Sequence, residues 1–141
     1  MPAGKWLFSR LVCWKAPFFG TISPRFEELR PGLSRVSMKK RRGVQNHIGT
    51  VHAIAMCNLA ELAAGTLTEV SIPASMRWLP KGMQVEYLKK AETGVEATAT
   101  VAEIAEGPGR DTPVTVEIRD QAGVTVCRAV ITMWVSPRKR E

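Results

Sequence analysis

A helical segment that is apolar on nearly every side is the feature that most constrains how this chain can fold. Residues 52–65 read HAIAMCNLAELAAG, in which small and apolar side chains surround one amide, Asn58, and one carboxylate, Glu61. A helix of this kind must be covered on several sides. We expect it to begin near His52 and to end between Gly65 and Val70.

The sequence changes from a helical period to a two-residue period at Gly82. Apolar and polar residues alternate over 95–101 and again over 114–119, which is typical of half-buried antiparallel strands. Further strands are expected over 84–90 and 124–135, with a hairpin turn at 120–123 and one earlier strand over 33–44. An apolar helix followed by an antiparallel meander is best buried by a sheet that curls around it. The predicted class is therefore α+β, with a curved antiparallel sheet wrapped around a long central helix.

The N-terminal segment 6–19 predicts an extra helix. Its larger apolar residues fall at helical spacing: Leu7, Leu11, Trp14 and Phe18. Arg10 and Lys15 interrupt the segment, so a signal peptide or a membrane span is not expected. We expect the apolar stripe to pack on the domain or on a partner subunit, with a role at a membrane surface as a second reading.

Prolines mark the expected breaks between elements. Pro24 and Pro31 flank a segment where a short helix is expected around 26–29, and Pro73 and Pro80 mark an irregular connection. We expect residues 1–32 to form a helical extension and residues 33–141 to form the domain.

The net charge of +7 lies in the N-terminal third of the chain. Residues 1–45 carry a balance of +8 and the remainder a balance of −1, with a cluster at Lys39-Lys40-Arg41-Arg42. This cluster fits either a solvated strand end or a site for a phosphate-bearing ligand. It is short and lacks interleaved aromatic residues, so no nucleic acid partner is expected.

The three cysteines, Cys13, Cys57 and Cys127, are widely spaced. Neither a disulfide framework nor a zinc site fits this spacing, and a reducing cytoplasm is the simplest location. No motif for a metal, a flavin or a nicotinamide is present, so no cofactor is expected.

Four residues at fixed spacing carry a resemblance to a known family. Asn46, Gly49, His52 and Glu61 match a motif of hotdog-fold acyl-CoA thioesterases, and the sequence resembles the phenylacetate-pathway type and a related hotdog family of undetermined function, DUF4442. The resemblance implies a hotdog fold over about residues 33–136. It implies an acyl-CoA thioester substrate and a homodimer, or a dimer of dimers, whose sheets pair edge to edge.

Two positions depart from the thioesterase pattern. Ala53 and Ile54 stand where two glycines normally follow the histidine, and Gly65 stands where some relatives carry Ser or Thr. Glycine lets a thioester approach the start of the helix closely, so Ile54 is expected to reshape that approach. These departures bear on substrate and rate more than on fold.

Helix geometry separates the two halves of this motif. Nine residues of regular helix give roughly 900° of rotation and about 13 Å of rise, so His52 and Glu61 cannot share one site within a chain. A joint role requires Glu61 of one subunit to face Asn46 and His52 of another.

The expected chemistry centres on Glu61, as a general base or as a nucleophile; the competing reading is that Asn58 and Glu61 form a face that simply meets water. Amides near Ala53 and Ile54 can polarise the thioester oxygen. Asn46 can orient water or the carbonyl, and His52 is either catalytic or a cap. The residues expected along the substrate are Gly49, Ala53, Ile54 and Asn58.

Three functions remain open at this point. The first is acyl-CoA hydrolysis, with the nucleotide phosphates near Lys39–Arg42, Lys89 or Lys90. The second is a non-catalytic hotdog module that binds acyl groups or serves in an assembly. A hotdog dehydratase ranks below both, because those enzymes place their histidine and acid differently.

Overall fold

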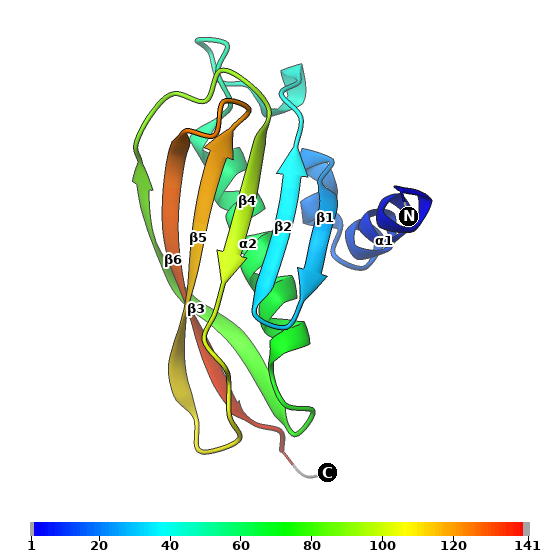
Figure 1. Cartoon of the computed structure of the whole chain (residues 1–141), viewed down its shortest axis with the longest axis vertical. Coiled ribbons are helices and arrows are strands. Elements are labelled where there is room, and N and C mark those ends of the chain that lie inside the picture. Colours follow the sequence, from blue (N-terminus) through cyan, green and yellow to red (C-terminus); the bar gives the residue numbers. More distant parts are fainter. Residues whose placement is uncertain (1, 140–141) are drawn as a thin grey trace.

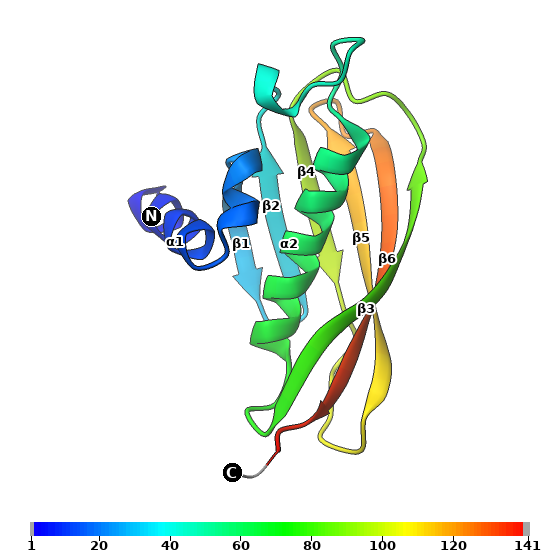
Figure 2. The same cartoon turned by 180° about the vertical axis from the view of Figure 1, so that it is seen from behind.

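Helix α2 (Ala53–Ser71) lies in the concave face of a curved, six-stranded antiparallel sheet (Figures 1 and 2). The computed structural model describes residues 2–139. The sheet has the order β1-β2-β4-β5-β6-β3. Its strands are β1 (Arg25–Arg30), β2 (Leu33–Met38), β3 (Met76–Tyr87), β4 (Val95–Thr100), β5 (Arg110–Asp120) and β6 (Thr125–Pro137). The α+β class and the wrapped central helix predicted from the sequence are confirmed.

The core lies between α2 and the inner face of the sheet. Leu59, Leu62 and Leu67 of α2 are almost fully buried. They face alternate residues of the strands, since side chains of a strand point to one face at every second position. The buried strand residues include Val36, Ala97, Ala99, Val114, Val116, Ile118, Ala129, Ile131 and Met133. Truncating one of the leucines to alanine in such a core costs roughly 2–5 kcal/mol.

The β5–β6 hairpin turn has the conformation its sequence predicts. Asp120 Oδ1 accepts hydrogen bonds from the amides of Ala122 and Val124, each at 3.0 Å. Gly123 has a φ of +82°, which glycine adopts without strain. This turn fixes the register of the two long strands that it joins.

The first strand lies where a short helix was expected. Residues 26–29 belong to β1, so that expectation is wrong: the helix-like spacing of Phe26 and Leu29 is overridden by antiparallel pairing with β2. The expected boundary between a helical extension (1–32) and the domain (33–141) falls between β1 and β2, which are hydrogen-bonded to each other. The strand expected over 33–44 ends at Met38, and Arg42–Val44 form a short 3₁₀ helix, η2.

Strand β3 begins at Met76, ahead of the predicted Gln84. The irregular connection expected up to Pro80 is therefore wrong. Pro80 is tolerated because β3 is an edge strand, and the pairing with β6 shifts between Pro80 and Gly82. The outer edge of β3 has no partner strand within the described residues.

Helix α1 (Pro2–Lys15) and the 3₁₀ helix η1 (Pro17–Ile22) lie beside β1 (Figure 1). The predicted apolar stripe does not pack on the domain. Its exposed fractions are 54% for Leu7, 55% for Leu11, 82% for Trp14 and 64% for Phe18. The opposite face of α1 makes the contact, through buried Ser9, through Val12, and through Phe8, whose ring meets Phe26 edge-on at 5.0 Å. Within residues 2–139, no helix combines the length and apolarity needed to cross a bilayer.

Candidate active site

The turn before α2 is organised by the side chain of Asn46. Its Oδ1 accepts hydrogen bonds from the amides of Ile48 and Thr50, at 3.1 and 3.0 Å, and its Nδ2 donates to Thr50 Oγ1 at 2.8 Å. Gly49 has a φ of +80°, a conformation that favours glycine. Asn46 and Gly49 thus each have a structural role in this turn within a single chain.

His52 is the N-cap of α2. Its Nδ1 accepts a hydrogen bond from the amide of Ile54 at 3.0 Å, and its ring is otherwise exposed. This bond satisfies one of the free amides at the helix start. The Ile54 amide was expected to polarise a thioester carbonyl, and in this conformation the cap already occupies it. The side chain of Ile54 is 59% exposed.

Glu61 lies midway along α2 and is half-buried. Its carboxylate makes no hydrogen bond or ion pair with any described residue. It lines an apolar cavity of about 640 Å³ between α1 and η1 on one side and β3 on the other. It also lines a smaller hollow of about 290 Å³ against β3. The residues of the larger cavity are Leu11, Val12, Lys15, Ala16, Phe19, Glu61, Leu62, Gly65, Thr66, Glu69, Trp78 and Pro80.

Asn58 does not line that cavity, although it precedes Glu61 by only three residues. Its side chain is buried, its Nδ2 donates to Thr21 Oγ1 of η1 at 3.4 Å, and its Oδ1 has no partner among the described residues. A buried amide oxygen without a donor is costly. The Asn58 side chain thus connects α2 to η1 through its Nδ2, and its Oδ1 remains available to accept a hydrogen bond.

The predicted site residues fall into two separate groups within the chain. Asn46 and Ala53 line a hollow of about 270 Å³ that also contains Tyr87. Glu61 lines other cavities, further along α2. One chain does not bring these groups together, and a shared site needs a second copy.

Trp78 is a cavity residue that sequence reasoning did not identify. Its Nε1 donates to Glu69 Oε2 at 2.6 Å, and its ring packs over Gly65. A Cβ on Gly65 would lie 3.1 Å from Trp78 Cη2, so the ring occupies the space that a Ser or Thr would need. One sequence signal pointed to this part of the cavity: Glu61, Gly65 and Glu69 are spaced one helical turn apart and so lie on a single face of α2.

The wrapped helix, the strand order and the antiparallel pairing define a hotdog-fold protein. The chain belongs to the DUF4442 family, a domain family of unknown function whose model matches residues 4–135. No curated protein matches the sequence.

Solved structures share this fold over most of their length. A structural genomics target is 50% identical, with 93% of this chain and 88% of that chain covered and a TM-score of 0.86. A protein of unknown function from Pseudomonas aeruginosa, described as a probable thioesterase, is 22% identical, with 98% and 97% covered and a TM-score of 0.82. A thioesterase from Staphylococcus aureus is 20% identical, with 85% and 98% covered and a TM-score of 0.75.

Proposed function

We propose that this protein hydrolyses acyl-CoA thioesters at a site built by two copies of the chain. The observation that carries the proposal is the unpaired, half-buried carboxylate of Glu61 in the wall of an apolar cavity of about 640 Å³. A carboxylate in such a place can act on a substrate because it forms no hydrogen bond or ion pair with any described residue. Two structures of the same fold carry the description thioesterase or probable thioesterase, which supports this choice of reaction.

The reaction would use Glu61 in one of two ways. As a general base, it takes a proton from water while the water oxygen attacks the thioester carbon; the C–S bond then breaks, and the proton passes to the leaving thiolate. As a nucleophile, its oxygen attacks the same carbon, the C–S bond breaks and the thiolate leaves, which forms an anhydride; water then hydrolyses the anhydride, restores the Glu61 carboxylate and supplies the proton of the thiol. Both routes yield a carboxylic acid and free CoA thiol.

The carbonyl oxygen would be stabilised at the start of α2 in the second subunit. Backbone amides there carry the positive end of the helix dipole, which favours the negative charge that develops on the oxygen. Asn46 would orient water or the carbonyl, and His52 either contributes directly or holds the helix start as its cap. Gly49, Ala53 and Ile54 would border the thioester, while the free Oδ1 of Asn58 is a further candidate contact.

The unpaired edge of β3 supports assembly with a second copy. β3 pairs with β6 on one side only, and it exposes Leu79, Met83 and Tyr87. A free edge strand with exposed apolar residues is a template for pairing with another strand. Pairing of two copies at β3, as a dimer or a dimer of dimers, would cover these residues. A cytoplasmic location remains a prediction from the cysteines.

The test is hydrolysis of a panel of acyl-CoA chain lengths by the wild type and by Glu61→Gln. Loss of the catalytic carboxylate is expected to lower kcat by about 10²–10⁴-fold. Glu103→Gln is the matched control, because Glu103 is exposed and lies outside the cavity. Unchanged turnover in Glu61→Gln would remove Glu61 from the mechanism.

A binding module without catalysis is the second candidate. It is favoured by the helix start, where Ile54 takes the place of a glycine and its amide is already bonded to His52. Saturable acyl-CoA binding with no turnover across the panel would support this candidate against hydrolysis.

A further inference from the structure

We propose that α1 and η1 form a surface that binds anionic membranes. In this arrangement the apolar outer side of α1 would enter the lipid headgroup region, and the cations beside it would contact acidic phospholipids. The proposal concerns where the protein sits, and it does not require that the protein be a thioesterase.

The amphipathic character of α1 is the reverse of that of an ordinary surface helix. Ser9 and Val12 face the domain. Residues of a helix follow one another at roughly 100°, so Leu7, Leu11 and Trp14 lie on the side opposite Ser9. The side facing solvent is thus the apolar one, and the exposed ring of Phe18 in η1 extends it. A surface helix normally turns its polar side to water.

Cations border this apolar side. Arg10 and Lys15 flank it on its two margins and are exposed, and residues 2–24 contain no acidic residue. The guanidinium of Arg10 lies over the ring of Trp6, 5.5 Å from its centroid. Tryptophan together with lysine and arginine is the composition of helices that lie in the plane of a membrane interface.

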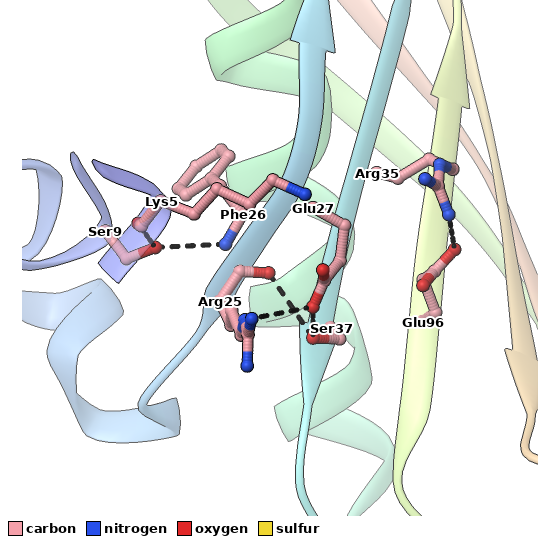
Figure 3. Close-up of polar contacts among 8 residues, drawn as sticks. All are labelled: Lys5, Ser9, Arg25, Phe26, Glu27, Arg35, Ser37 and Glu96. Atoms are coloured by element: carbon pink, nitrogen blue, oxygen red, sulfur yellow. Dashed lines mark hydrogen bonds and ion pairs between the residues drawn. The ribbon is translucent and has the colours of Figure 1, made fainter. Parts of the chain in front are cut away.

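A hollow between the two exposed tryptophans adds a place for a phosphate group. It has a volume of about 520 Å³, and Trp6 and Trp14 border it together with three cations: Arg10, Arg25 and Lys39. Arg25 is partly neutralised by Glu27, whose Oε1 lies 3.4 Å from its Nε (Figure 3). Arg10 and Lys39 form no ion pair with any described residue. The phosphate of a phospholipid headgroup would supply a negatively charged partner for these two cations.

Charge also argues against the pairing of two α1 surfaces with each other. Two α1 surfaces brought face to face would place the same cations opposite one another, and like charges across an interface oppose association. An acidic lipid surface is complementary to both the cations and the apolar side chains.

The experiment is co-sedimentation of the full chain with vesicles at low salt. One set of vesicles is phosphatidylcholine alone, and the other is three parts phosphatidylcholine to one part phosphatidylglycerol. We expect binding to the acidic vesicles only, weakening as salt is added. Leu7→Ala/Trp14→Ala should lower the affinity about tenfold or more, and Arg10→Gln on the order of fivefold.

The matched control is Val124→Ala, because Val124 is an exposed apolar residue in the β5–β6 turn. It should bind as the wild type does. The proposal is overturned if the acidic vesicles do not retain the protein, or if the double variant binds them as well as the wild type. It is equally overturned if the double variant changes the oligomeric state by size exclusion, since the face would then cover another copy. None of these measurements depends on thioester hydrolysis, so their outcome is independent of the proposed reaction.

Discussion

The hydroxyl of Ser9 accepts a hydrogen bond from the backbone amide of Phe26 at 3.0 Å and thereby joins α1 to the edge strand β1 (Figure 3). The same hydroxyl donates to the carbonyl of Lys5 at 2.8 Å. Both groups of this contact are buried. The sheet edge at β1 is thus blocked at Phe26 by a helix, which is one way in which proteins keep an edge strand from pairing with other chains.

Replacing Ser9 by alanine should loosen this contact. The Phe26 amide would lose its acceptor while still buried, which costs about 1–3 kcal/mol in free energy of unfolding. Denaturant unfolding measures the loss, and limited proteolysis after Lys5 or Arg10 should become faster. Ser37→Ala is the control, because Ser37 hydrogen-bonds Glu27 and Arg25 where solvent can replace the bond. An equal loss in both variants would contradict the role of Ser9.

Gly65 and Trp78 should be energetically coupled. Alanine at Gly65 gains about 1 kcal/mol of helix propensity, but its Cβ would press on the ring at 3.1 Å, which costs about 1–3 kcal/mol. Gly65→Ala is therefore expected to be neutral or destabilising in the wild type. In a Trp78→Ala background, the same change should stabilise the protein. A double-mutant cycle by thermal or urea unfolding checks this, and additive effects would refute the coupling.

A shared site predicts complementation between inactive chains. Asn46→Ala and Glu61→Gln homodimers should each be impaired, while a mixed dimer holds one site with both residues intact. Random exchange of subunits makes about half of the dimers mixed, so the mixture should recover about a quarter of wild-type turnover. The assay is turnover before and after unfolding and refolding the two chains together. No recovery, despite confirmed mixed dimers, would place the site within one chain.

The Cys127 thiol should resist alkylation in the folded protein. Burial, with a smaller contribution from Cys57, raises its pKa to about 11, so little thiolate exists near neutral pH. Its side chain is also inaccessible. Iodoacetamide at pH 8 followed by mass spectrometry should label Cys127 only after unfolding. If Cys127 in the folded protein were labelled as fast as in the unfolded chain, the prediction would be wrong, and β6 would expose this thiol readily.

Glu28 should contribute to acid sensitivity. Hydrogen bonds from Arg30 and then Arg35 hold the pKa of its carboxyl below the ordinary value of 4.5. A lowered folded-state pKa adds stability above the ordinary value, and that stability is lost as the pH falls through the lowered pKa. The melting temperature of Glu28→Gln should thus approach that of the wild type as the pH drops below 4.5. A gap that persists at lower pH would assign the difference to something other than this carboxylate.

Local sequence patterns predicted the central elements because those patterns are the physical cause of the elements. The alternation at 95–101 became β4, and the aspartate and glycine at 120–123 closed the last hairpin as expected. The apolar run at 52–65 became α2, which continues to Ser71.

The misplaced elements depend on contacts between distant residues. β1 forms because β2 pairs with it, and β3 includes Pro80 because its outer edge needs no amide donor at that position. The stripe at Leu7 and Trp14 has the same spacing whether it faces the domain or solvent, so sequence alone could not orient α1. In the candidate site, the packing of Trp78 on Gly65 joins β3 to α2, and no local pattern encodes it.

Helix α1 also sets a limit on assembly. A sheet with two open edges can add copies at both ends and grow into a fibre. Here α1 occupies the Phe26 amide at the β1 edge, whereas the β3 edge has no partner strand within the described residues. Two copies that join at β3 would form one continuous sheet with an α1 helix beside each outer edge, where it hinders pairing with a further strand at Phe26.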